Sequence, residues 1–116
     1  PTRPGSRPHQ LSIYYKENTM QFTDLKFERA HGLAQAKVQF GKYQLSVIKE
    51  DLRDWYEVAI FDDDMFVQLP GIHPNYFDDW SDDVIPGLDQ DQVQAIMIKL
   101  ELIQGIQQNE LEEVND

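Results

Sequence analysis

The sequence predicts a small α+β domain: an antiparallel β-meander of three to five strands with one C-terminal α-helix packed on one face. Two observations support this prediction. Apolar residues recur with a period of two between Ala36 and Leu69, and they recur at helical spacing between Val93 and Ile103. With 116 residues, the chain is long enough for one domain. We expect this domain to occupy residues 20–105.

The most regular stretch is a predicted β-hairpin. Apolar residues alternate with polar ones along both of its arms: Ala36, Val38 and Phe40, then Tyr43, Leu45 and Val47. The intervening Gly41-Lys42, with glycine first, suits a two-residue type II′ turn. This turn sets Phe40 opposite Tyr43 and places all six apolar side chains on one face, as a correct register requires.

Two further strands are expected after the hairpin. The charged segment 49–54 is expected to connect to a strand over Trp55–Phe61, in which Tyr56, Val58 and Ile60 face the core. We expect the strand to end at Asp62, Asp63 and Asp64, because aspartate is depleted in strands and favoured in turns. A short strand over Met65–Leu69 would then close at Pro70-Gly71.

The sequence indicates both where the C-terminal helix begins and which of its faces is buried. Asp89 suits an N-cap, and Gln92 three residues later completes a capping-box pattern. The apolar stripe that would cover the sheet consists of Val93, Ile96, Met97, Leu100 and Ile103. Gly105 is expected just past the helix end, and residues 106–116 then form an acidic C-terminal tail.

The remaining segments are less regular. Residues 1–19 are rich in proline, glycine and arginine, which predicts a flexible N-terminal arm or extension, with Met20 as a natural start. We expect a short strand over residues 21–24 and a connection over residues 28–32. Residues 70–92 form a long link, and links of that length in compact domains are usually functional or disordered.

The charge distribution limits the function classes. The net charge is −11, and residues 54–98 contain eleven acids and no Lys or Arg. We therefore expect no direct nucleic-acid binding by the globular part, since it would repel phosphates. No apolar run approaches the roughly 20 residues of a membrane span. The chain also has no cysteine and no leader-like segment, so we expect a cytoplasmic protein. The oligomeric state stays open.

The acids do not match a metal-binding motif. An EF-hand loop needs glycine at its sixth position, but that position holds Val67 when counted from Asp62 and Asp83 when counted from Asp78. We expect no metal and no cofactor. Without a cysteine or a serine in a recognisable nucleophile motif, we also expect no enzyme. The alternative is a small enzyme that uses His73 with the neighbouring aspartates.

Acidic and aromatic residues together suggest a surface that binds a protein partner, and that partner would have a basic surface. The aromatics of the 70–92 link either fill the open end of the core or form an exposed patch. A second hypothesis is a DNA-mimic inhibitor of a nucleic-acid-binding host protein, since closely spaced carboxylates can imitate phosphates. The candidate partner-binding residues are Asp62, Asp63, Asp64, Tyr76, Phe77, Asp78, Asp79, Trp80, Asp82 and Asp83.

Four segments carry a resemblance: Tyr43–Ile48, Tyr56–Phe61, Phe66–Leu69 and Asp82–Ile85. In them the chain resembles small uncharacterised proteins of tailed bacteriophages, including phages of cyanobacteria. The resemblance covers about residues 20–105 and involves structural positions, with no catalytic motif. It implies a phage origin, the cytoplasm of the host cell as the location, and a β-meander followed by a helix. Residues 70–77 and the arm before Met20 depart from the pattern.

Overall fold

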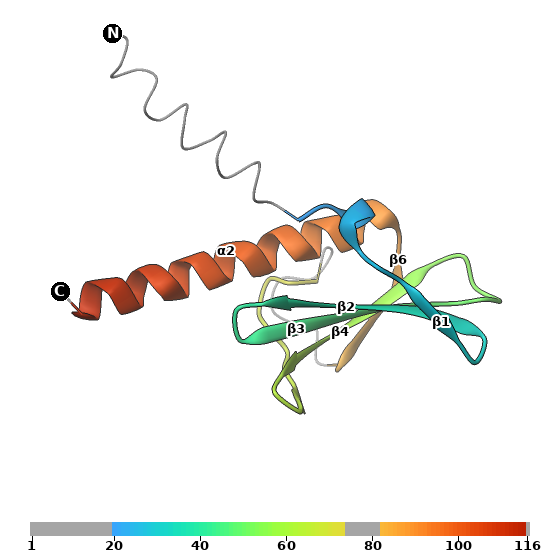
Figure 1. Ribbon diagram of the computed structural model, residues 1–116, viewed down its shortest axis with the longest axis horizontal. Helices are drawn as coiled ribbons and strands as arrows, with labels where there is room; N and C mark the ends of the chain where they lie inside the picture. Colours follow the sequence, from blue (N-terminus) through green and yellow to red (C-terminus); the bar gives the residue numbers. More distant parts are fainter. Residues whose placement is uncertain (1–19, 74–81, 116) are drawn as a thin grey trace, which may run out of the picture.

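One antiparallel sheet and one long helix make up the structure, as the sequence predicts (Figure 1). The computed structural model describes residues 20–73 and 82–115, with side chains as far as Gly105. No helix within these residues is long and apolar enough to cross a membrane. The elements are η1 (Phe22–Asp24), β1 (Glu28–Ala30), β2 (Leu33–Phe40), β3 (Tyr43–Glu50), β4 (Tyr56–Asp62), β5 (Met65–Phe66), β6 (Val84–Leu88) and α2 (Gln90–Asn115).

The sheet has six strands in a simple order. Strands β1, β2, β3 and β4 follow one another as a meander, and every pairing is antiparallel. Both β5 and β6 pair with the remaining edge of β4, β5 near Asp62 and β6 along the Tyr56–Ala59 half. Strand β4 therefore has neighbours on both sides and lies inside the sheet.

The predicted hairpin is confirmed residue by residue. Phe40 lies opposite Tyr43, Val38 opposite Leu45 and Ala36 opposite Val47. Gly41 has a φ of 60°, the left-handed conformation that the first position of a type II′ turn requires. Leu45 and Val47 are fully buried.

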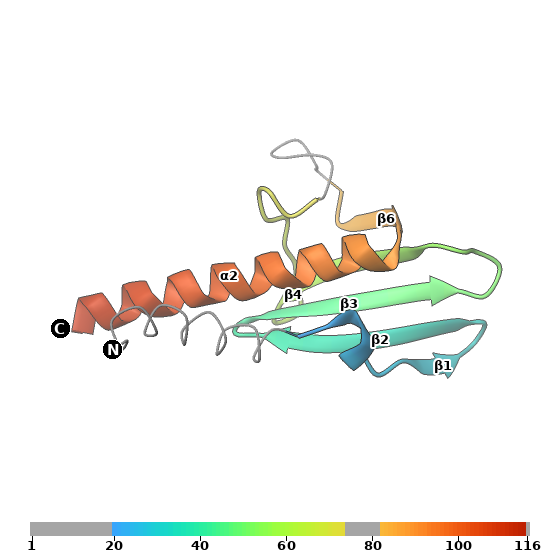
Figure 2. The same ribbon diagram turned by 90° about the horizontal axis from the view of Figure 1, so that it is seen from above.

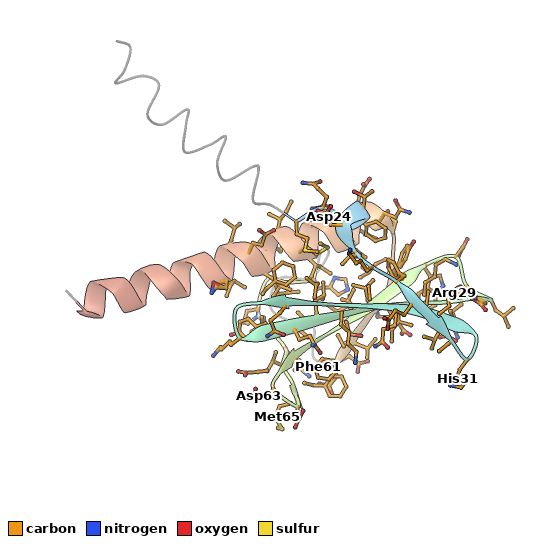
Figure 3. All side chains as sticks on the ribbon, in the orientation of Figure 1. Asp24, Arg29, His31, Phe61, Asp63 and Met65 are labelled. Carbon is orange, nitrogen blue, oxygen red and sulfur yellow. The ribbon has the colours of Figure 1, made fainter. Side chains whose placement is uncertain are left out.

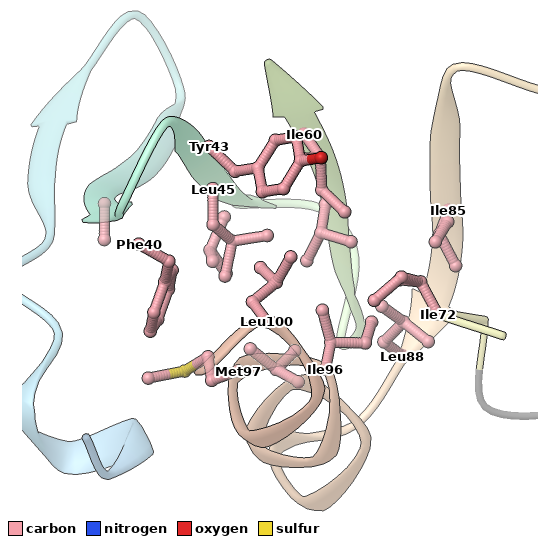
Figure 4. Close-up of a cluster of buried hydrophobic side chains, with 14 of the residues drawn as sticks. Phe40, Tyr43, Leu45, Ile60, Ile72, Ile85, Leu88, Ile96, Met97 and Leu100 are labelled. Carbon is pink, nitrogen blue, oxygen red and sulfur yellow. The ribbon is translucent and has the colours of Figure 1, made fainter. Parts of the chain in front are cut away.

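Helix α2 covers one face of the sheet, and Figure 2 shows it running along that face. The capping box is present: the Gln92 N–H donates to Asp89 Oδ1 (2.8 Å), and the Asp89 N–H donates to Gln92 Oε1 (2.9 Å). The predicted stripe faces the core. Its first four members are fully buried and Ile103 is partly buried, and Figure 4 shows Ile96, Met97 and Leu100 packed against residues of the sheet.

The predicted helix end at Gly105 is wrong. Helix α2 continues to Asn115, so residues 106–115 extend the helix beyond the sheet (Figure 1). Gly105 does not have the left-handed conformation of a C-cap. A glycine inside a helix costs only about 1 kcal/mol, which the neighbouring good helix formers can offset.

The N-terminal assignments also differ from the structure. Residues Phe22–Asp24 form a 3₁₀ turn rather than a strand, because the Gln21 N–H donates to the Asp24 carboxylate (2.8 Å) and the Asp24 N–H donates back to the Gln21 carbonyl (2.9 Å). The segment expected as a connection forms β1 and a tight turn. In that turn His31 (φ 54°) and Gly32 (φ 82°) are both left-handed, which two-residue hairpin turns favour.

The expected strand boundaries need four further corrections. Strand β3 extends through Lys49 and Glu50, so the connection is shorter than expected. Asp62 still belongs to β4, and the turn consists of Asp63 and Asp64. The expected strand over residues 65–69 is reduced to Met65–Phe66. The 70–92 link contains β6, which was not predicted because Pro86 and Gly87 are uncommon inside strands.

A buried leucine and an exposed one should respond differently to truncation. Leu100→Ala removes a fully buried side chain from the contact between α2 and the sheet, so we expect the free energy of unfolding to fall by about 2–5 kcal/mol. Leu52 is 100% exposed, and Leu52→Ala should change it by less than about 0.5 kcal/mol. Urea denaturation of both variants measures this difference. Equal losses would contradict the assignment of the core.

The capping box provides a second test of the fold. Asp89→Ala removes the acceptor of the Gln92 N–H bond, so we expect a loss of about 1 kcal/mol in the free energy of unfolding. Asp89→Asn keeps an acceptor at the same place and should retain most of that stability. Urea denaturation again provides the measurement. An alanine variant as stable as the asparagine variant would show that the cap contributes nothing.

Candidate docking surface

The face of the sheet opposite α2, here called the outer face, has no described element packed over it. Side chains alternate between the two faces of a strand, so the neighbours of the core residues point outward. Two rows of cross-strand neighbours define the outer face: Lys37, Ser46, Ala59 and Val84, then Gln39, Gln44, Phe61 and Phe66. Figure 3 shows Phe61 and the β4–β5 turn on the side of the sheet away from α2.

Two adjoining hollows lie on this face, and together we call them the outer groove. The first, the apolar hollow, has a volume of about 370 Å³ and is lined by side chains of β2 to β6 and by the β4–β5 turn. Its apolar lining consists of Ile48, Ala59, Phe61, Phe66 and Val84. The second, the acidic hollow, is lined by Gln39, Gln44, Asp63 and Asp64. The two hollows share Gln44 and both aspartates, so they form one continuous depression.

Aromatic side chains form one wall of the outer groove. Phe61 and Phe66 face each other across the β4–β5 pairing, with ring centroids 4.5 Å apart. Phe66 remains 46% exposed, and the adjacent Met65 is 69% exposed. Large apolar side chains exposed side by side are a feature of binding surfaces.

The β4–β5 turn places two carboxylates at the end of the groove. Asp62 forms an ion pair with Lys42 (Nζ to Oδ2, 3.6 Å), which offsets part of its charge. Asp63 and Asp64 have no ion-pair partner among residues 20–73 and 82–105. Asp63 also has a φ of 57°, a conformation that aspartate tolerates better than most residues. Within the described residues, the turn therefore contributes two charges without an ion-pair partner to the groove.

The groove also contains polar groups on its floor. Ser46 is only 4% exposed, and its hydroxyl oxygen accepts a hydrogen bond from Gln35 Nε2 (2.9 Å). The hydroxyl proton has no acceptor among the described side chains and backbone. Such a group can bond to a ligand without first losing a protein contact.

The structure separates the predicted candidate residues into different places. Asp63 and Asp64 line the outer groove, whereas Asp82 and Asp83 line another cavity together with His73. Asp83 accepts a hydrogen bond from Gln68 Nε2 (3.0 Å). Five candidates lie outside the described residues: Tyr76, Phe77, Asp78, Asp79 and Trp80.

The cavity beside His73 is small, about 20 Å³, which is room for a single water molecule. His73 is 7% exposed. Burial lowers the pKa of its imidazole, and the positive charge of Lys99 on α2 lowers it further. The pairing of His73 with Asp78 or Asp79 stays a prediction, because both aspartates lie outside the described residues.

Sequence reasoning missed the aromatic and polar parts of the outer groove. Attention to the inward residues of each strand left Gln44, Ser46 and Phe61 without a role. A signal was available, since Ile48, Ala59 and Phe61 are apolar residues at outward positions of strands. Apolar residues on both faces of a strand indicate that both faces are used.

Metal binding and similarity to known proteins add no further assignment. No group of three His, Cys, Asp or Glu side chains within the described part of the chain could hold a metal ion. Comparison with protein-family models, with curated proteins and with solved structures found no match. The outer groove is therefore interpreted from its own chemistry.

Titration of His73 should make stability depend on pH. Its pKa is lower in the folded protein than the ordinary 6.5, so the unfolded chain binds the proton more readily. We expect the free energy of unfolding to fall as the pH decreases below 6.5. Glu101 has the opposite effect on stability near pH 4.5, its ordinary pKa, because burial raises the pKa of its carboxyl group in the folded protein. Stability should therefore be measured above that pH range.

The control for this prediction is a pair of histidine substitutions. His73→Gln should flatten the pH dependence of the urea midpoint, whereas replacement of the exposed His31 by glutamine should leave it unchanged. The assignment fails when the His73 variant keeps the same slope as the wild type.

Proposed function

We propose that the protein is a non-catalytic, acidic protein-interaction module, encoded by a phage, that binds a basic surface of a host or virion protein through its outer groove. The observation that carries this proposal is the outer groove itself. It combines an apolar lining, two exposed apolar side chains and two carboxylates that have no ion-pair partner in the described part of the chain. The phage origin is supported by the sequence resemblance alone.

The apolar part of the groove is the source of binding energy. Full burial of one large apolar side chain contributes about 1.5–3 kcal/mol, and Phe66 begins about half exposed. Its further burial is therefore worth about 1 kcal/mol, and Met65 adds to it. Central aromatic side chains are common among the residues that dominate protein interfaces.

The acidic part acts on the rate and on the choice of partner. A single exposed ion pair contributes at most about 1 kcal/mol, so Asp63 and Asp64 do not supply most of the affinity. A net charge of −11 nevertheless attracts basic surfaces over long distances and accelerates association. A partner with a basic rim around an apolar residue fits both contributions.

Retention of a protein from a bacterial host lysate on the immobilised chain tests this function. We expect less of a retained protein when Asp63→Asn and Asp64→Asn are combined, and also with Phe66→Ser. Retention by the wild type should decrease with added salt, because salt screens exposed charges.

Two matched variants provide the controls. Asp24→Asn removes an exposed acid next to α2, and Leu52→Ser removes an exposed apolar side chain from the β3–β4 loop. Neither should reduce retention. Retention that is equal for all variants contradicts a role of the outer groove. Displacement of the retained protein by duplex DNA would instead favour the DNA-mimic hypothesis.

A further inference from the structure

The outer groove has two parts of different chemistry, and this division limits what can fill it. The apolar hollow contains Ala59, Phe61 and Val84, and Asp63 and Asp64 lie where it joins the acidic hollow, which adds Gln39. A partner that fills both must present one apolar and one basic side chain toward the same side. The following inference rests on the proposed function and specifies the partner's binding segment.

The floor of the groove indicates the backbone conformation of that segment. Ser46 offers a hydroxyl proton, and Gln44 offers an amide that makes no hydrogen bond within the described residues. The backbone of a helix is already hydrogen-bonded within itself and has little use for such groups. An extended segment leaves its backbone N–H and C=O groups available. Its side chains two positions apart also point the same way, about 7 Å from each other.

The acidic hollow favours arginine over lysine. Its acceptors are the carboxylates of Asp63 and Asp64 and the amide oxygens of two glutamines. Gln39 uses its Nε2 to donate to the Gly41 carbonyl (2.9 Å), which leaves its amide oxygen as an acceptor. A guanidinium group carries five donors in a plane and suits several acceptors at once, whereas an ammonium group carries three.

Lys37 restricts the partner further. It lines the apolar hollow but not the acidic one. Its charge repels a second base placed over the apolar hollow. A uniformly basic segment is therefore a poorer fit than one with a single base.

We propose that the outer groove binds an extended partner segment in which an apolar residue and an arginine lie two positions apart. The apolar side chain occupies the apolar hollow, and the guanidinium group occupies the acidic hollow. The backbone between them bonds to Ser46 and Gln44.

Synthetic capped peptides provide the test. The first peptide contains leucine, threonine and arginine in that order, between alanines. The second has arginine directly after leucine, and the third replaces arginine by the neutral citrulline. Each is titrated to millimolar concentration into the ¹⁵N-labelled full chain, and the backbone amide shifts are measured.

The expected result is a set of shifts at Gln44, Ala59 and Phe66 with the first peptide. The citrulline peptide should bind about fivefold more weakly or worse, since an exposed ion pair contributes up to about 1 kcal/mol. The second peptide should also bind more weakly, because its two side chains point to opposite sides. The combined Asp63→Asn and Asp64→Asn variant should remove the difference between arginine and citrulline. Asp24→Asn should keep it.

Two results overturn the inference: equal binding of all three peptides, or no shifts in the outer groove with any of them. Neither result decides the proposed function, which the lysate experiment tests without any peptide. If retention there depends on Asp63, Asp64 and Phe66 while the peptides fail, the partner binds the groove in another way. If retention does not depend on those residues, the proposed function itself fails.

Discussion

A single helix can cover only one face of a sheet, and this constraint determines the rest of the molecule. The apolar stripe of α2 buries the inward side chains of β2, β3 and β4, with Leu45 and Leu100 fully enclosed. No second described element covers the outward side chains. Phe61, Phe66 and Ala59 therefore border an open groove, although residues of these types would otherwise favour burial. The candidate binding surface is a consequence of how the core is built.

The same packing makes the groove rigid. Ala59 lies between the buried Val58 and Ile60, and β4 is paired on both sides. Ser46 likewise lies between Leu45 and Val47, which are fully buried. Movement of the groove floor would disturb the core, and the core is close-packed. A preformed groove loses little conformational freedom on binding, which favours recognition of a short segment.

Sequence patterns revealed the parts of the fold that repeat over many residues. The hairpin register followed from six alternating apolar positions and Gly41, and the start of α2 followed from Asp89 and Gln92. Strands β1 and β6 were not predicted because neither shows an alternating apolar pattern. Strand β1 has only three residues, and β6 has five that include Pro86 and Gly87. Strand β1 pairs with the strand directly after it, whereas β6 pairs with β4, more than twenty residues earlier in the chain. The site was found only in part: Asp63 and Asp64 stood out by charge, whereas Phe61 and Ser46 acquire meaning only across strands.

A comparison of two turns in this chain links the groove to its sequence. The β2–β3 turn has glycine at its left-handed position, Gly41, which suits that backbone without strain. The β4–β5 turn has Asp63 at the corresponding position, also left-handed, followed by Asp64. A side chain in this conformation is less stable than glycine, even for aspartate. Only the second turn borders the outer groove with its carboxylates. The β1–β2 turn has a non-glycine residue in the same conformation, His31, and does not line the groove, so this conformation alone does not mark a binding turn. What distinguishes the β4–β5 turn is that its two carboxylates line the groove, as expected when a turn serves binding as well as folding.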